Sequence, residues 1–266
     1  MYSNKTIILT GASEGIGRAL ALELATDAPN LVLAARNRER LESLAVDCES
    51  LGAKCLVLPT DVTDENACRE LIEKTVETFG GLDVLINNAG GSMWSRLDQL
   101  TGTAPLEQLM KLNYLSAAWC SYYALPALKK SRGQIVAVSS VAGLTGVPTR
   151  TGYCAAKHAM MGFFDSLRIE LAADGVGVTI IAPDFVLSEI HQRALGSDGK
   201  ALGESPLEAK SGVMTSEECA ALIYKSMTGR KRILITSFRG KLGRILRILA
   251  PSIIDKVAAK AVADLR

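Results

Sequence analysis

The sequence has 266 residues, of which 22% are charged, and its formal net charge at pH 7 is +2. A chain of this length can bury a large core, so a single α/β domain is the expected organisation. No apolar run approaches the roughly 18 to 20 residues that a membrane-spanning helix needs. The apolar stretch at the N-terminus is too short for a signal peptide. These features argue against an integral membrane protein and predict a cytoplasmic one.

The cysteines form no C-x-x-C pair, and the chain has only two histidines. Zinc sites and disulfide frameworks need closer and more regular spacing of such residues. We therefore expect reduced, mostly structural cysteines and no metal site. The six cysteines stand at positions 48, 55, 68, 120, 154 and 219.

Apolar runs of strand length alternate with longer stretches of helical period along most of the chain. Such alternation produces right-handed crossovers and a doubly wound parallel sheet with helices on both faces. We therefore predict a single α/β domain of the Rossmann type. Strands are expected near residues 6–10, 31–35, 54–59, 84–87, 134–139, 178–182 and 233–236. Helices are expected near residues 15–26, 38–51, 65–79, 106–129, 152–173 and 216–228.

A glycine-rich turn follows the first expected strand. Its spacing is G-x-x-x-G-x-G, with Gly11, Gly15 and Gly17, and an amphipathic helix begins within it. Glycines let the backbone turn tightly and approach a pyrophosphate, which the N-terminus of a helix stabilises electrostatically. The turn therefore indicates a dinucleotide-binding site.

An acid/base device is indicated by Tyr153 and Lys157, which share one face of a helix because they are four residues apart. A tyrosine has an ordinary pKa near 10, so acid/base work at neutral pH needs a cationic neighbour. Ser140 ends an apolar run thirteen residues before the tyrosine and could hold a substrate oxygen near the phenol. Alone, such a Tyr–Lys pair is more often an ordinary exposed helix pair.

Together with the sequence N-N-A-G at 87–90, these motifs resemble the short-chain dehydrogenase/reductase family. The resemblance runs in order from about residue 5 to residue 188. It implies a seven-stranded sheet in the order 3-2-1-4-5-6-7, with cofactor and substrate over the carboxyl ends of the strands. It also implies a homodimer or homotetramer formed through the helices that hold Asn113 and Tyr153.

The resemblance implies a role for each of four catalytic residues. Tyr153 would exchange a proton with the substrate oxygen, and Ser140 would orient and polarise that oxygen. Lys157 would lower the pKa of the tyrosine and hold the nicotinamide ribose. Asn113 matches the fourth residue, whose amide could hold a water in the proton relay, although a helical asparagine more often bonds its own backbone or solvent.

Cofactor preference is expected to be set at the end of the second strand. Ala35 stands where family members that prefer NAD carry an acidic residue, and Arg36 follows it. A guanidinium there would bind the 2′-phosphate of NADP, with help from Arg38 or Ser13. Alternatively, Arg36 is only a solvent-exposed residue at the strand end. A second observation argues against NADP: Glu14 occupies a turn position where NADP-preferring members often have a basic residue. We predict that NADP(H) is preferred over NAD(H).

The adenine end of the cofactor site is expected at Asp61 and Val62, which resemble the family's adenine-binding pair. Asp61 could instead cap a helix, a role that is also open to Thr63 or Asp64. The complete predicted set of cofactor-binding residues is Gly11, Ser13, Glu14, Gly15, Ile16, Gly17, Arg36, Arg38, Asp61, Val62, Asn88, Ala89, Gly90, Tyr153, Lys157, Pro183, Val186 and Ser188.

The segment 183–188 departs from the family pattern P-G-x-V-x-T. Asp184 replaces the glycine, and Ser188 replaces the threonine that bonds the nicotinamide carboxamide. Serine keeps the hydroxyl, whereas aspartate lacks the backbone freedom of glycine and brings a charge near the cofactor. The sequence leaves open whether Asp184 binds a ligand or is a turn residue. The following glycines predict a substrate lid at about 188–214. His191 in this lid could contact a substrate, although a lone loop histidine is more often solvated.

The C-terminal extension separates charge from the rest of the chain. Residues 1–228 are expected to form the NADP(H)-binding catalytic region, and residues 229–266 the last strand and a basic extension. Residues 229–266 carry ten Lys/Arg and two Asp, giving +8 and leaving −6 elsewhere. A basic amphipathic helix pair at 238–266 could lie peripherally on the inner face of a membrane against anionic lipid, or pack on the core or a partner subunit. The extension lacks interleaved aromatic residues, so nucleic-acid binding is not expected.

Two classes of function follow. The first is an NADPH-dependent oxidoreductase that interconverts a carbonyl and a secondary alcohol, with a lipophilic ketone or 3-oxoacyl-type compound as its small-molecule substrate. The second is an NADP(H)-binding sensor or scaffold that docks to a membrane or partner. The presence of all four catalytic residues favours the enzyme, because a sensor does not need them.

Overall fold

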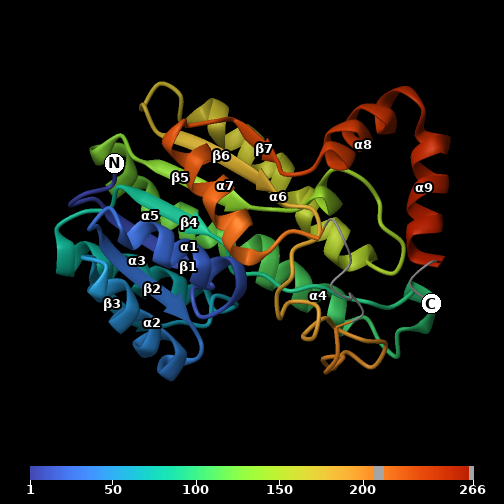
Figure 1. Cartoon of the computed structure of the whole chain (residues 1–266), viewed down its shortest axis with the longest axis horizontal. Helices are drawn as coiled ribbons and strands as arrows, with labels where there is room; N and C mark the ends of the chain where they lie inside the picture. Colours follow the sequence, from blue (N-terminus) through green and yellow to red (C-terminus); the bar gives the residue numbers. More distant parts are fainter. Residues whose placement is uncertain (206–212, 264–266) are drawn as a thin grey trace.

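The computed structural model describes residues 1–205 and 213–263, with side chains described to residue 260. Its centre is a parallel seven-stranded sheet in the order β3-β2-β1-β4-β5-β6-β7, which confirms the predicted topology (Figure 1). The strands are β1 (Thr6–Thr10), β2 (Asn30–Ala35), β3 (Lys54–Pro59), β4 (Val84–Asn87), β5 (Gln134–Val138), β6 (Gly177–Ala182) and β7 (Ile233–Ile235).

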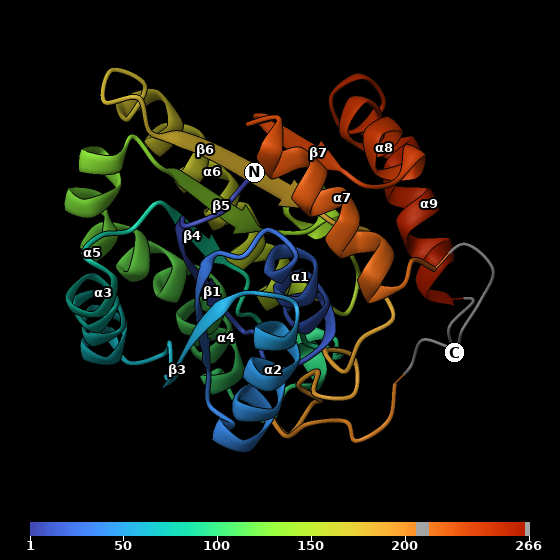
Figure 2. The ribbon, with the colours of Figure 1, turned by 60° about the vertical axis from the view of Figure 1, so that its left-hand side comes forward.

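Helices cover both faces of the sheet, as predicted (Figure 2). One face packs against α1, α2 and α7, and the other packs against α3, α5 and α6. The described helices are α1 (Gly15–Ala25), α2 (Arg38–Ser50), α3 (Glu65–Phe79), α4 (Ala104–Leu109), α5 (Ser116–Ser131), α6 (Thr151–Glu170), α7 (Ser216–Thr228), α8 (Phe238–Leu249) and α9 (Pro251–Ala263), with short turns η1 (Leu97–Gln99), η2 (Met110–Leu115) and η3 (Val141–Gly143).

Alternation along the buried strands assigns side chains to the two cores. In β1, Ile7 and Leu9 pack with the α1, α2 and α7 side, whereas Ile8 packs on the opposite face. All three are fully buried, because a parallel sheet covered on both sides has no solvated face. The carboxyl ends of the strands therefore form a rigid edge from which loops can present polar groups.

The helix expected at 106–129 is divided in the structure. Helix α4 passes into a π-helical turn, η2, before α5 begins at Ser116. The cause lies at Asn113, whose Nδ2 donates to the Leu109 carbonyl at 3.0 Å and to the Gly91 carbonyl at 3.1 Å. These bonds accompany a widened helix, and π-helical turns are frequent at functional sites.

The C-terminal extension forms two helices, α8 and α9, which stand beside the sheet rather than over it (Figure 1). Proline at the first position of α9 is suited to a helix start, because its missing N–H would have no partner there. No helix within the described ranges is both long and apolar enough to cross a bilayer. All six cysteines are present as free thiols.

Candidate active site

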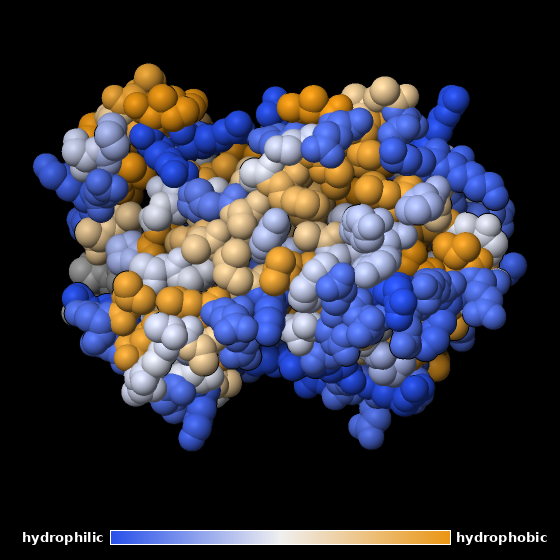
Figure 3. Space-filling model, turned by 180° about the vertical axis from the view of Figure 1, so that it is seen from behind, coloured by the Kyte–Doolittle hydropathy of each residue, from blue (hydrophilic) through white to orange (hydrophobic). Residues whose placement is uncertain are grey.

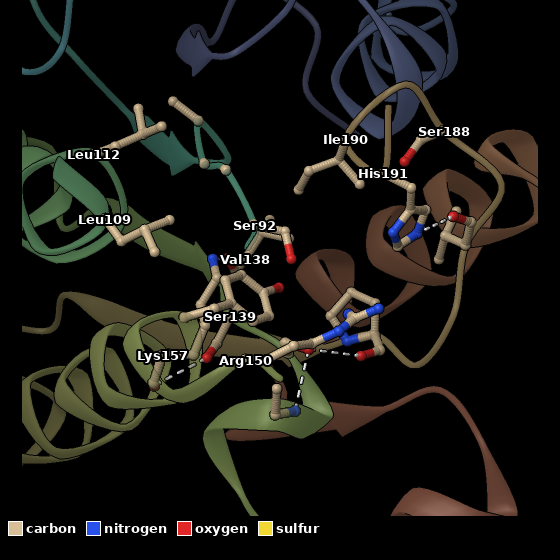
Figure 4. A pocket seen from close by; sticks show the side chains of 18 of the residues that line it. Ser92, Leu109, Leu112, Val138, Ser139, Arg150, Lys157, Ser188, Ile190 and His191 are labelled. Carbon is tan, nitrogen blue, oxygen red and sulfur yellow. Dashed lines mark hydrogen bonds between the residues drawn. The ribbon is translucent and has the colours of Figure 1, made fainter. Parts of the chain in front are cut away.

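A cavity of about 1110 Å³ lies along the carboxyl ends of the strands. It runs from the glycine-rich turn after β1, past the ends of β2 to β6, to helices α8 and α9. Figure 4 shows part of its wall, including Ser139, Lys157 and His191. Every residue of the predicted site lines this cavity except Arg38 and Asn113.

The glycine-rich turn is closely packed against the segment that follows β4. Gly11 and Gly15 have φ angles of +66° and +50°. A Cβ on Gly17 would lie 2.0 Å from the Gly11 carbonyl oxygen, and a Cβ on Gly11 would lie 2.8 Å from the Ala89 Cα. Side chains at these positions would collide with backbone, so the turn needs glycine.

Hydrogen bonds from Asn88 and Thr10 join the two segments. The Asn88 Nδ2 donates to the carbonyl oxygens of Thr10 and Gly11, at 3.0 and 3.2 Å. The Thr10 hydroxyl accepts from the backbone N–H groups of Asn88 and Ala89. Asn88 therefore holds the shape of the turn through its side chain.

The adenosine end of the cavity contains a cluster of arginines and glutamates. Arg36 is exposed on the cavity wall and makes no ion pair within the described ranges. Arg38 lies outside the cavity and pairs with Glu42, so the structure does not bring it to the predicted site. Arg40, which the sequence analysis did not identify, lines the cavity instead and bonds Glu14 at 2.8 Å.

An ionic cluster connects the glycine-rich turn to the expected lid. Glu14 bonds both Arg40 and Arg193, and Glu189 bonds the same two arginines at 3.1 and 2.9 Å. The two glutamates and two arginines therefore balance one another in charge, so the carboxylate of Glu14 is paired. The part of the expected lid at 206–212 lies outside the described residues.

Two carboxylates follow β3, and they have different partners. Asp64 caps α3 by accepting from the Asn66 N–H at 2.8 Å. Asp61 lines the cavity and accepts from the N–H and hydroxyl of Thr63, at 3.0 and 2.8 Å. The alternative that Asp61 is the helix cap is therefore wrong.

Tyr153 and Ser140 meet in the middle of the cavity wall. Tyr153 lies on the first turn of α6 and is buried, with 7% of its surface exposed. Burial raises the pKa of its phenol, and a hydrogen bond with the Ser140 side chain lowers it in part. The Ser140 hydroxyl also accepts from the Ala142 N–H at 3.1 Å, which fixes its direction. The neighbouring Ser139 instead donates to the Lys157 carbonyl at 3.2 Å, within the core.

Lys157 is buried without an acidic partner among the described residues. Its ammonium Nζ donates to the Val138 carbonyl at 2.9 Å and lies 5.7 Å from the centre of the Tyr153 ring. Burial lowers the pKa of Lys157 to about 7. The effect of Lys157 on the pKa of the phenol stays a prediction, and Arg150 is a further cation that lowers this pKa.

Asn113 lies behind the cavity wall, fully buried. Its Oδ1 accepts from the Gly91 N–H at 3.2 Å, and both hydrogens of Nδ2 are used by backbone carbonyls. A Cβ on Gly90 would lie 2.8 Å from this Oδ1 and 3.5 Å from the Lys157 Nζ. Glycine at 90 thus allows the asparagine and the lysine to approach the same point, while the role of Asn113 in a water relay stays a prediction.

Arg150, the residue before α6, was not identified from the sequence. Only 6% of it is exposed, and its guanidinium lies 4.3 Å from the centre of the Trp94 ring and 5.4 Å from that of Phe185. Its Nη2 is buried without a hydrogen-bond partner. Cation–π contacts contribute about 2 kcal/mol when desolvated, whereas burying an ion costs several kcal/mol.

His191 is 6% exposed and lines the cavity, so of the two alternatives for this residue the solvated one is wrong. Its Nε2 lies 3.3 Å from the Val186 carbonyl, and its Nδ1 is buried without a partner. Burial lowers the pKa of His191 to about 4, with a further contribution from the positive charge of Arg150. The imidazole is therefore neutral at physiological pH.

Asp184 ties the end of β6 to the start of α8. Its carboxylate accepts from the Ser237 hydroxyl at 2.6 Å and from Arg239 at 2.7 and 3.1 Å. It also accepts from the Phe185 N–H at 3.0 Å. The charge that replaces the expected glycine is therefore neutralised, and it fixes the extension to the cavity. Ser188 lines the cavity next to Gly15, and its bond to a carboxamide stays a prediction.

The residues at the turn fit a dinucleotide. Helix α1 begins within the turn, and Glu14 at its N-cap makes no capping hydrogen bond to the helix. The first N–H groups of α1 are thus left without a side-chain cap at the cavity wall, where Gly15, Ile16 and Gly17 lie. With Arg36 exposed on the same wall, these donors suit a phosphate-bearing ligand.

Comparison with known proteins agrees with this arrangement. The sequence pattern of the short chain dehydrogenase family matches residues 5–197. The chain is 33% identical over 257 residues to an 11-beta-hydroxysteroid dehydrogenase of Pinus massoniana, with 94% of this chain and 72% of that protein covered.

Two solved structures have the same architecture. An alcohol dehydrogenase of the archaeon Thermococcus sibiricus, complexed with 5-hydroxy-NADP, matches with a TM-score of 0.76 and 26% identity over 87% of this chain and 95% of that one. A short chain dehydrogenase/reductase of Burkholderia phymatum, in complex with NAD, has the same fold, with a TM-score of 0.83 and 23% identity over 95% of each chain. The chain therefore belongs to the short-chain dehydrogenase/reductase family of oxidoreductases.

Proposed function

We propose that this protein is an NADPH-dependent carbonyl reductase, or a dehydrogenase in the reverse direction. The observation that carries the proposal is the meeting of Tyr153 and Ser140 on the wall of one cavity, with the buried Lys157 one helical turn beyond the tyrosine. Such an arrangement gives a proton donor, a hydroxyl that fixes its direction and a nearby cation.

The chain's residues would manage the proton and the geometry. A bound nicotinamide cofactor would supply the hydride. Tyr153 would donate its proton to the carbonyl oxygen during reduction and accept one from the alcohol during oxidation. Ser140 would hold that oxygen, and the positive charge of Lys157 would stabilise the phenolate between turnovers. Burial of the tyrosine excludes competing water from this exchange.

A preference for NADP(H) is supported by charge at the adenosine end. Arg36 is exposed on the cavity wall without an ion pair among the described residues, so its guanidinium can bond a 2′-phosphate. Arg40 lines the same cavity and is paired with Glu14 and Glu189. The residue at the end of β2 is Ala35, so no carboxylate stands there to repel a phosphate. One of the two similar structures carries a 5-hydroxy-NADP and the other carries NAD, so the relatives alone do not decide this preference.

A lipophilic substrate is supported by the far end of the cavity. Helix α9 contributes Ile254, Val257 and Ala258 to its wall, which also includes the apolar side chain of Leu144, and α8 contributes Gly240 and Gly243 together with Arg239 and Arg244. An apolar wall favours an apolar ligand body, because burying it removes hydrocarbon surface from water. A similar protein from pine is named a hydroxysteroid dehydrogenase.

Peripheral contact with a membrane is supported by the outer side of α8 and α9. The exposed fraction is 54% at Ile245 and 79% at Ile248, and Figure 3 shows apolar surface gathered at the upper left over this region. Helix α8 docks through Arg239 and Arg247 instead, so its apolar stripe faces outward. A bilayer interface would cover such a stripe and attract its lysines and arginines.

Self-association is the second surface proposal. Helices α5 and α6 expose Tyr122 and Ile169, with 68% and 67% of their surfaces accessible. Exposed apolar side chains on neighbouring helices are typical of subunit interfaces. We therefore propose a homodimer or homotetramer that uses these two helices.

The proposal is tested by replacing Tyr153 with phenylalanine. Turnover of NADPH with a panel of ketones, graded from small and polar to long and polycyclic, should fall by about a thousandfold or more, because general acid/base catalysis and orientation are both lost. The dissociation constant for NADPH should change little, and NADH in parallel should support slower turnover.

Unchanged turnover in the Tyr153→Phe variant would contradict the enzymatic proposal. If the wild-type chain binds NADPH tightly and no carbonyl on the panel is reduced, the alternative of an NADP(H) sensor or scaffold gains support. Binding of the protein to a membrane or a partner, without turnover of any carbonyl, would support the sensor or scaffold over the enzyme.

A further inference from the structure

The cavity contains a buried cation, Arg150, that has no assigned part in the proposed proton transfer. Arg150 precedes α6 and lies between the rings of Trp94 and Phe185, with Tyr153 on the next turn of the helix. Figure 4 shows Arg150 among the side chains that surround the cavity, together with Lys157 and His191. The guanidinium thus lines the same cavity as Tyr153 and Ser140, which would hold the substrate oxygen.

No carboxylate in the described part of the chain pairs with Arg150. Its side chain donates no hydrogen bond to residues in the ranges 1–205 and 213–260, and its Nη2 is wholly buried. Other arginines on the cavity wall have partners, since Arg239 bonds Asp184 and Arg193 bonds Glu14 and Glu189. Arg150 therefore differs from them in being both buried and unpaired.

The aromatic contacts compensate for only part of this burial, because a guanidinium has five N–H donors at its edge and aromatic faces cover only its plane. An unpaired buried charge is strongly unfavourable, and a bidentate carboxylate matches the guanidinium edge in geometry and charge. A ligand that brings a carboxylate would satisfy the orphaned donor. The unpartnered His191 Nδ1 can accept a further hydrogen bond from a hydroxyl on the same ligand.

We propose that the substrate is an apolar oxo acid, whose ionised carboxylate binds the Arg150 guanidinium while its ketone lies at Tyr153 and Ser140. The inference rests on the proposed reductase function and specifies the substrate class for it. The proximity of Arg150 and Tyr153 requires a short separation between the carboxylate and the ketone. The hydrocarbon body of the ligand then extends along the apolar wall formed by α9.

The test compares each acid with its own methyl ester. The substrates are oxo acids of one chain length in which the ketone moves away from the carboxylate by one carbon at a time. The wild-type enzyme should reduce at least one acid with a kcat/KM about tenfold to a hundredfold above that of its ester, as expected for a charge-assisted bidentate contact. Arg150→Gln should bring that ratio close to one, because it should lower the kcat/KM of the acid far more than that of the ester.

Arg150→Lys should keep part of the preference for the acid, since an ammonium retains the positive charge but cannot form the bidentate contact. The matched control is Arg244→Gln, because Arg244 lines the same cavity but is exposed to solvent. This control should leave the ratio of acid to ester unchanged. A wild-type enzyme that reduces esters as well as acids would overturn the proposal, as would loss of the preference in Arg244→Gln alone.

Equal losses for acid and ester in Arg150→Gln would assign the residue to activation of Tyr153 or to folding, and would also overturn the proposal. If no ketone is reduced at all, the proposed function fails, and binding decides the inference separately. Calorimetry of the NADPH-loaded protein with a saturated fatty acid and its methyl ester should then show tighter binding of the acid, abolished by Arg150→Gln. Equal affinities would refute carboxylate recognition.

Discussion

The burial of the Lys157 ammonium lowers the stability of the folded protein. Burial lowers its pKa to about 7 from an ordinary value near 10.5. Between these two values the unfolded chain binds more protons than the folded chain, so the free energy of unfolding rises with pH. The slope approaches about 1.4 kcal/mol per pH unit at its steepest. Below about pH 7 the folded protein bears the full penalty of the buried charge.

We predict that Lys157→Met removes this dependence. The variant should be at least as stable as the wild type at pH 7, because an apolar side chain of similar length replaces a buried cation. Its stability should then gain less than that of the wild type between about pH 7 and pH 10, and reductase activity should be lost. Urea unfolding of both proteins without cofactor, at several pH values, measures the difference. Parallel curves would show that Lys157 keeps its charge on folding.

The residues that the sequence predicted well are those whose function depends on local spacing. Tyr153 and Lys157 share a helix face because of their separation, and Ser140 follows a strand that apolar residues define. Arg150 was missed because its burial depends on aromatic residues far away in the chain, Trp94 and Phe185. His191 is buried next to Phe185 and Val186, but a histidine in a glycine-rich segment gives no local signal of burial. A basic residue beside a helix start carries no local signal that distinguishes a buried ligand site from a solvated end.

At the scale of single elements, α8 is held by polar anchors rather than by an apolar face. Asp184 and Ser237 fix its first turn, while Arg247 donates to the Leu144 carbonyl at 2.6 Å. Gly240 brings the helix close to the sheet, since a Cβ there would lie 2.7 Å from Val141 Cγ1. An amphipathic pattern in the sequence predicts the helix and leaves open whether its apolar side packs on the core, on a partner or on a membrane. In the structure Ile245, Ile248 and Leu249 on that helix are exposed.

We predict that Asp184→Ala lowers the free energy of unfolding by about 1 to 3 kcal/mol, because it removes several charge-assisted bonds at a side chain that is only 12% exposed. A matched control is Asp98→Ala, which breaks the exposed pair with Arg96 and should cost less than about 1 kcal/mol. Thermal unfolding compares the two variants. A double-mutant cycle with Arg239→Gln should show coupled effects on the free energy of unfolding. Additive effects would contradict a stabilising interaction between Asp184 and Arg239.

The division of the helix at 104–131 shows why element boundaries resist prediction. Periodicity alone favours one continuous helix, and no proline or glycine interrupts the residues of η2. The widening accompanies two hydrogen bonds from Asn113, one of which goes to Gly91 in another segment of the chain. Existence and type of the element follow from local sequence, whereas its internal geometry depends on tertiary contacts.

At the scale of the whole molecule, charge and apolar exposure coincide at one end. Residues 229–266 carry +8 in a chain whose remainder carries −6. The exposed apolar side chains of α8 and α9 lie within this basic region, including Phe238, Ile248 and Leu249 at 75% exposure or more. The sequence predicted both the segregation and the helices. It left open which partner covers them, because amphipathicity does not specify the apolar surface that a helix meets.

We predict that the protein sediments with vesicles containing anionic lipid and less with vesicles of neutral lipid, with binding reduced by high salt. Replacing Ile245 and Ile248 together by serine should weaken binding at least tenfold, because both side chains would leave the lipid interface. The control Leu97→Ser removes a side chain of similar exposure elsewhere, 56%, and should have no effect. Concentration-dependent dimerisation that the double variant abolishes, without vesicle binding, would assign the stripe to a second copy of the chain.

The cavity is built by two parts of the chain that differ in how freely they can change. The proposed proton donor and its neighbours stand on the sheet edge and on α6, where each is fixed by buried partners. The far wall comes from the last two helices, which touch the rest of the protein through a few anchors. During evolution, mutations in those helices could therefore change which molecules are accepted and leave the chemistry intact, so that new specificities arise from old enzymes by remodelling one end of the gene.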